Sequence, residues 1–121
     1  MARFMRSLSY AISGIAYAVR TQRHIRFHLI AAILVCGISA ILALTRLEWA
    51  ILLLTIAFVI AAEMINTAIE QVVDLASPNL HPLAKAAKDV AAGAVLIAAM
   101  MAVIIGLLIL GPPLWHLLSH I

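Results

Sequence analysis

The chain has 121 residues, of which 66% are hydrophobic and only 11% are charged. Soluble domains average about 45–50% apolar and about 25% charged residues, so this composition excludes an ordinary soluble domain, a disordered chain and a disulfide-rich secreted module. The net charge of +3 comes from basic residues beside apolar runs, which favours contact with anionic lipid headgroups over nucleic acid. The remaining class is a small, single-domain, all-α integral membrane protein.

Residues 1–26 form the first predicted element. They contain five arginines and no acidic residue. Apolar residues recur at steps of three or four positions, at Phe4, Leu8, Ile12, Ile15 and Val19. A basic helix with one apolar face is typical of segments that lie in the membrane interface. We therefore expect an amphipathic surface helix over 1–26 and no signal peptide.

Three apolar runs follow, and we expect each to cross the bilayer, because a spanning helix needs about 20 residues. The predicted spans cover 27–45, 49–75 and 82–110. Arg46–Glu48 is predicted to be a short polar turn, with Trp49 at the interface. Pro82 suits the first turn of the third span, and Gly111, Pro112 and Pro113 are expected to end it.

The distribution of basic residues predicts the orientation. Residues 1–26, called the N-terminal arm below, contain five basic residues and the 75–89 connection contains two, whereas the 46–48 turn contains one. Positive charge favours the cytoplasmic side, so we expect a cytoplasmic N-terminus and an external C-terminus.

A row of polar residues interrupts the second predicted span. Glu63 and Glu70 are seven positions apart and Asp74 follows four later, which places all three carboxylates on one helix face, with Asn66 about 60° away. A carboxylate at membrane depth costs several kcal/mol unless it is paired or hydrated, and such residues usually serve function. Salt bridges to Lys88 or to an arginine are the purely structural alternative.

The chemistry of these residues leaves three classes open. Carboxylates that bind Mg²⁺ and cations that hold phosphates are the parts of phosphoryl transfer. A proton-coupled transporter also needs intramembrane carboxylates, and a structural membrane protein needs only the ion pairs. The other candidates are read conservatively: Cys36 as packing, His24 and His28 as headgroup-contacting or helix-ending residues, and His116–His120 as a poor metal pair.

Two segments carry a resemblance to a known family. Ala62–Asp74, with its Glu63, Asn66, Glu70 and Asp74, and Ala84–Leu96, with Lys88-Asp89, resemble the signature of the prokaryotic diacylglycerol kinase and undecaprenol kinase family. The resemblance covers nearly the whole chain. It implies a homotrimeric bundle in the bacterial cytoplasmic (inner) membrane, with active sites at subunit boundaries, that phosphorylates a lipid alcohol with ATP and Mg²⁺.

The resemblance also implies roles for individual residues. Glu63 would be the general base on the lipid hydroxyl, Asn66 would orient Glu63 or the substrate, and Glu70 would hold Mg²⁺ with the phosphates. The lipid would contact Ser7, Glu63, Trp49 and Ala92. The ATP site would include Arg3, Tyr10, Gln22, Glu70, Asp74, Asn79, Leu80, His81, Lys88 and Asp89.

One position departs from the family pattern. The family commonly places a second metal-binding glutamate where this chain has Gln22, whose carbonyl can ligate Mg²⁺ but carries no charge. We therefore expect altered metal dependence with the reaction retained. The resemblance implies that the acceptor is either undecaprenol or diacylglycerol. Within the family, His81-Pro82-Leu83-Ala84-Lys85 resembles the undecaprenol branch more closely.

Overall fold

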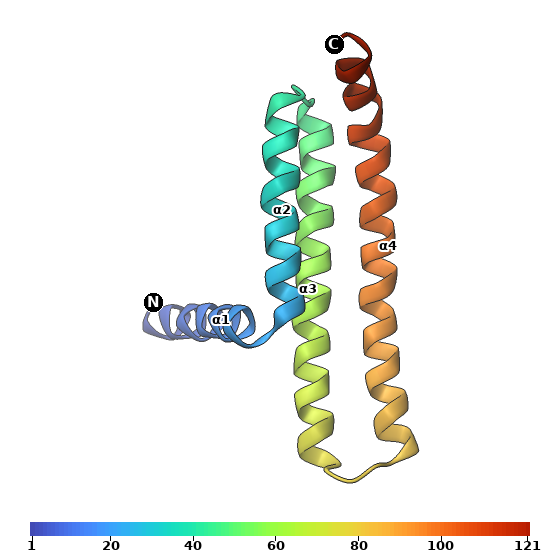
Figure 1. The fold of residues 1–121 in the computed structure, drawn as a ribbon. Helices are drawn as coiled ribbons and strands as arrows, with labels where there is room; N and C mark the ends of the chain where they lie inside the picture. Colours follow the sequence, from blue (N-terminus) through green and yellow to red (C-terminus); the bar gives the residue numbers. More distant parts are fainter.

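The computed structural model describes all of residues 1–121. It contains four helices, α1 (Ala2–Thr21), α2 (Arg23–Ile41), α3 (Arg46–Ala76) and α4 (Pro82–Ser119). Helices α2, α3 and α4 stand side by side, while α1 leads away crosswise from the foot of α2 (Figure 1). The three upright helices are each long and apolar enough to cross a membrane, which confirms an all-helical chain with three candidate spans.

A sharp corner at Gln22 separates α1 from α2. The Gln22 backbone is extended (φ −106°, ψ 112°), and its N–H donates to the Ala18 carbonyl at 2.8 Å. Nη1 of Arg26 donates to the carbonyls of Val19 and Arg20, at 3.2 and 2.8 Å, which lie in the last turn of α1. The corner therefore lies four residues before the predicted end of the arm at residue 26, because Arg26 caps α1 from within α2.

The turn between α2 and α3 also lies earlier than predicted. Helix α2 ends at Ile41, and Ala43 turns the chain with a positive φ of 52°. Thr45 Oγ1 accepts the Glu48 N–H at 3.2 Å, and Glu48 Oε2 accepts the Thr45 N–H at 2.8 Å. This reciprocal capping box makes residues 46–48 the first turn of α3, so the first span ends before Thr45.

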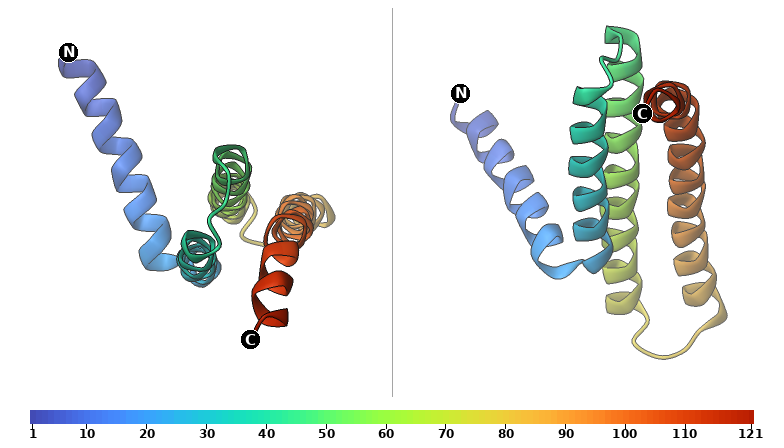
Figure 2. Two further views of the ribbon diagram at one scale, coloured as in Figure 1. Left: turned by 90° about the horizontal axis from the view of Figure 1, so that it is seen from above. Right: turned by 45° about the horizontal axis from the view of Figure 1, so that its top comes forward.

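Helix α4 begins at Pro82, as expected, but it does not end at Leu110. It continues to Ser119 through Pro112 and Pro113. Prolines inside a helix remove backbone hydrogen bonds and push against the preceding turn, which kinks a helix without always ending it. The segment after the prolines accordingly turns sideways from the axis of α4 (Figure 2, left).

Packing within one chain is sparse. Only 11 of the 121 residues are buried, and most of the buried apolar ones lie on α3 and α4, at Leu52, Val59, Ala91, Val95, Ala98 and Leu110. Helix α3 has its most extensive contacts with α4 and fewer with α2. Most large apolar side chains remain exposed, so they are available to lipid or to further copies of the chain.

Candidate active site

The predicted polar row forms one graded face of α3. Glu63 is buried with 6% of its surface exposed, Asn66 and Glu70 are partly buried, and Asp74 is exposed near the end of the helix. Asp74 lies eleven positions after Glu63, which corresponds to about 16 Å of helix at 1.5 Å per residue. The row therefore runs from a buried position between the helices to the exposed end of the bundle, where residues 77–81 connect α3 to α4. This exposed end is called the open end below.

His28 of α2 is the polar side chain that meets the Glu63 carboxylate. Its Nε2 atom lies 3.3 Å from Oε1 of Glu63, and both side chains are largely buried. Thr67, one turn further along α3, donates from Oγ1 to the Glu63 backbone carbonyl at 3.0 Å and so leaves the carboxylate free. The buried carboxylate thus has a single side-chain partner within the chain, and it comes from a different helix.

Asn66 contacts the next carboxylate of the row. Its Nδ2 donates to Oε1 of Glu70 at 3.2 Å, so within this chain it orients Glu70 and not Glu63. Its Oδ1 is buried and has no hydrogen-bond partner. A buried unpaired acceptor is costly, and a substrate hydroxyl or another polar group would satisfy it.

Two ion pairs form at the open end of the row. Lys88 of α4 binds the Asp74 carboxylate of α3 and so links the two helices. Lys85 lies 2.5 Å from Asp89, one turn away on the same helix. Lys88 thus pairs with one carboxylate of the row, Asp74. This pair is the structural role that the sequence analysis gave as an alternative to catalysis.

The predicted site residues of α1, Arg3, Ser7 and Tyr10, form no hydrogen bond or ion pair with this row within one chain. Ser7 bonds through Oγ to the Arg3 carbonyl of its own helix at 3.1 Å. Arg3, Ser7 and Tyr10 lie on the part of α1 that extends away from the three upright helices (Figures 1 and 2). The contact between α1 and α3 is made nearer the corner, where Gln71 Nε2 donates to the Tyr17 hydroxyl at 2.8 Å.

The remaining predicted residues are spread over the chain. Trp49 lies in the first turn of α3, 14 residues before Glu63, so the two are about 21 Å apart along the helix. Asn79, Leu80 and His81 are exposed in the connection to α4, and His81 caps that helix by accepting the Leu83 N–H on Nδ1 at 3.1 Å. Ala92 is exposed on α4.

The donors present suit Mg²⁺ shared with a nucleotide. No three His, Cys, Asp or Glu side chains in this chain converge to hold a metal ion. Mg²⁺ is commonly bound by one or two carboxylates together with substrate phosphates, and Glu70 is a partly exposed carboxylate. Gln22 lies at the α1–α2 corner and is partly exposed as well, so its side-chain carbonyl is a second possible donor.

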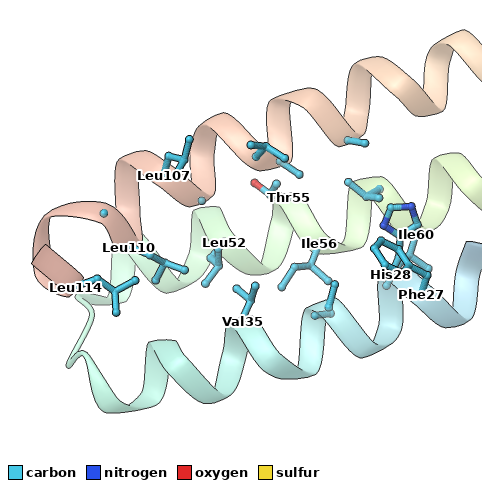
Figure 3. Close-up of a pocket in the computed structure, with 18 residues that line it drawn as sticks. Phe27, His28, Val35, Leu52, Thr55, Ile56, Ile60, Leu107, Leu110 and Leu114 are labelled. Carbon is cyan, nitrogen blue, oxygen red and sulfur yellow. The ribbon is translucent and has the colours of Figure 1, made fainter. Parts of the chain in front are cut away.

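An apolar groove lies between α2, α3 and α4 and extends away from the polar row. Its volume is about 510 Å³. Leu107, Leu110 and Leu114 lie toward one end, and His28 with Ile60 lies at the other (Figure 3). His28 therefore borders both the apolar groove and the buried end of the carboxylate row.

Sequence reasoning missed His28, which was read as a headgroup contact or a helix end. A signal was present, because two helices joined by a short turn run antiparallel. His28 lies 13 residues before the end of α2, and the thirteenth residue after the start of α3 is Val59, about one turn from Glu63. Tyr17 and Gln71, 54 positions apart, carried no comparable signal.

Three apolar helices with a buried carboxylate and a charged open end define a membrane protein with a polar site at one side of its helix bundle. Comparison with known proteins gives the class. The profile of the family described as prokaryotic diacylglycerol kinase matches residues 9–110. The chain belongs to this family, and it is a lipid kinase.

Individual relatives support this assignment. The chain is 47% identical over 114 residues to the undecaprenol kinase of Bacillus subtilis, covering 93% of this chain and 91% of that protein. It is 46% identical to the diacylglycerol kinase of Synechocystis, covering 93% of this chain and 65% of that protein. The diacylglycerol kinase of Escherichia coli K12 is 31% identical over 102 residues, which is 84% of each chain.

Proposed function

We propose that this protein transfers the γ-phosphate of ATP to a lipid alcohol at the cytoplasmic side of a bacterial inner membrane. The observation that carries the proposal is the graded face of α3, which joins buried Glu63 to the exposed Asp74–Lys88 pair. A lipid hydroxyl approaching from the bilayer and a nucleotide approaching from water can meet along this face. A transporter with a carboxylate central in its span would not need the charged open end.

Glu63 is the proposed general base. Its carboxylate removes the proton of the lipid hydroxyl, and the resulting oxygen nucleophile attacks the γ-phosphorus of ATP. The bond between the γ-phosphorus and the β–γ bridging oxygen breaks and ADP leaves. The proton remains on Glu63 until the lipid phosphate has also left and water reaches the open site. The burial of Glu63 excludes bulk water, which would otherwise compete with the lipid alcohol.

Glu70 and its neighbours form the proposed nucleotide side. Glu70, oriented by Asn66, would hold Mg²⁺ together with the phosphates, and Gln22 would supply a second, uncharged donor. The ion would neutralise charge on the phosphate oxygens. Lys88 is held beside α3 by Asp74 and would face the phosphates, with Asp89, Asn79, Leu80 and His81 around the nucleotide.

The homotrimer is part of the proposal. Arg3, Ser7 and Tyr10 extend away from the row of their own chain, so they would serve a site only where copies of the chain adjoin. The large exposed apolar surface supports such assembly. The N-terminal helix would then lie along the cytoplasmic surface of the membrane, with the C-terminus outside.

The acceptor is undecaprenol or diacylglycerol, and the segment from His81 to Lys85 favours undecaprenol. The relatives do not decide, since those with the two names are 47% and 46% identical to the chain. The test compares ADP release with each lipid at equal mole fraction in mixed micelles. We expect faster turnover with undecaprenol; ATP consumption that ignores added lipid alcohol, or none at all, would contradict the proposed function.

A further inference from the structure

His28 is the one polar side chain of α2 that enters the interior of the bundle beside a carboxylate. The relative exposed areas of the two side chains are 20% for His28 and 8% for Glu63, and the distance between Nε2 and Oε1 is 3.3 Å. The neighbouring Phe27 ring meets the imidazole edge-on, with 5.6 Å between ring centroids. The imidazole therefore contacts both an aromatic ring and the carboxylate.

No other residue of the chain is placed to do the same for Glu63. Thr67 bonds to the Glu63 backbone, Asn66 bonds to Glu70, and the lysines of α4 pair with Asp74 and Asp89. Without a partner, a buried carboxylate is free to rotate and is costly to keep charged. The only side chain placed to contact the Glu63 carboxylate is therefore His28, because the other polar residues of α3 are bonded elsewhere.

We propose that His28 is a positioning residue for the general base: its Nε2–H holds Oε1 of Glu63 and leaves Oε2 directed to the lipid hydroxyl. This inference rests on the proposed role of Glu63. In this structure the 3.3 Å contact is an ion-pair distance and not an aligned hydrogen bond, and contacts of this kind commonly align and tighten when substrate binds. His28 does not touch the reacting atoms and acts only through Glu63.

The place of His28 in the groove explains why such a partner is needed. His28 lies at one end of a groove lined mostly by apolar side chains (Figure 3). The other polar side chain that lines the groove, Thr55, donates its hydroxyl to the Ile51 carbonyl, so the groove offers Glu63 no competing donor. A fixed donor from α2 therefore sets which carboxylate oxygen points along α3 and which remains available for the proton.

Two substitutions at His28 separate a hydrogen-bonding role from a packing role. His28→Gln keeps an N–H close to the position of Nε2 but removes the ring, whereas His28→Phe keeps the ring and removes the donor. We expect His28→Phe to lower kcat by about 10- to 100-fold, the range for losing one hydrogen bond to a charged group. We expect His28→Gln to stay within about threefold of the wild-type kcat.

The KM values for ATP and for the lipid alcohol should change by less than about twofold in both variants, because His28 contacts neither substrate. His28→Asn, whose amide is one carbon shorter, should resemble His28→Phe. The matched control is His24→Phe, one turn earlier on α2 at an exposed position, and it should leave kcat unchanged. Circular dichroism melting of each full-length variant in micelles verifies that the helices remain folded.

The outcomes distinguish this inference from the proposed function. If Glu63→Gln is inactive while His28→Phe keeps full kcat, Glu63 remains the base and the positioning role is overturned. If His28→Phe is active and His28→Gln is not, His28 only packs, and the inference is likewise overturned. If Glu63→Gln itself turns over, the base assignment fails and the role of His28 fails with it.

Discussion

The two halves of α3 differ in polarity and in their partners. From Trp49 to Ala62 the helix has no charged residue, and its buried side chains, Leu52 and Val59, pack beside the apolar groove. From Glu63 onward it contains three carboxylates and two amides, Asn66 and Gln71, with partners on α1, α2 and α4. One continuous helix is thus a membrane anchor in its first half and the wall of a polar site in its second, with Glu63 at the junction.

The largest expected effect is at that junction. Glu63→Gln keeps the shape of the side chain and removes the base, so we expect the rate to fall by at least about 10²-fold, with ATP affinity within a few fold. Turnover in mixed micelles and nucleotide binding by titration check the two parts. More than about a tenth of the wild-type rate would show that the polar half of α3 does not contain the base.

A second substitution tests Glu70, the carboxylate that follows Glu63 along α3, as the residue that holds Mg²⁺. Glu70→Ala should raise the Mg²⁺ concentration for half-maximal activity and weaken ATP binding together, by about tenfold or more, because the ion joins the carboxylate to the phosphates. Mg²⁺ titrations at several ATP concentrations measure both. An unchanged Mg²⁺ curve would move the ion to Asp74 or Asp89, further along the open end.

The corner at Gln22 provides a third test. Gln22→Glu adds a negative charge at the position where the family commonly has glutamate. Two unit charges about 4 Å apart interact by roughly 4 kcal/mol at an effective dielectric near 20, before desolvation is subtracted. We expect the Mg²⁺ requirement to fall by several fold with little change for the lipid. A shift in the lipid or ATP titration alone would instead place Gln22 against those substrates.

The smallest effect concerns the link between α3 and α4. The Asp74 and Lys88 side chains are 63% and 39% exposed, and pairs exposed to this degree are worth about 0–1 kcal/mol. We therefore expect Asp74→Asn to change thermal stability little. The Lys85–Asp89 pair within α4 is the matched comparison, through Lys85→Gln. A large loss of stability in Asp74→Asn alone would mean that the pair is shielded from water by assembly.

Periodicity and charge were sufficient to predict the helices but not how they begin and end. The 3.6-residue repeat fixed the direction of Glu63, Glu70 and Asp74, since residues on one helix share its geometry. Boundaries depended on caps, which involve single hydrogen bonds: Arg26 reaching back to α1, and Thr45 with Glu48 starting α3. Proline was taken as a stop, although α4 accommodates Pro112 and Pro113 with a kink.

Contacts between helices were harder to predict than positions on one helix. The row on α3 follows from spacing alone, but the partner of Glu63 depends on how α2 rotates about its axis, and one sequence does not fix that rotation. The position of α1 was equally hard to predict. Where Arg3 and Tyr10, the predicted nucleotide-binding residues, lie depends on the direction in which α1 leaves the corner at Gln22 (Figure 1).

The turns at both ends of α2 also make the protein sensitive to the thickness of the lipid bilayer. Its 19 residues span about 28 Å between Gln22 and the turn at Ala43, close to the ~30 Å of hydrocarbon in a typical bilayer. Helices α3 and α4 are longer than the bilayer requires, so they can tilt or extend beyond the hydrocarbon layer. Helix α2 has no additional turn with which to do so. Hydrophobic mismatch costs fractions of a kcal/mol per ångström, so acyl-chain length would act first on α2. Membranes of different thickness would then present the same lipid hydroxyl at different heights relative to one fixed carboxylate.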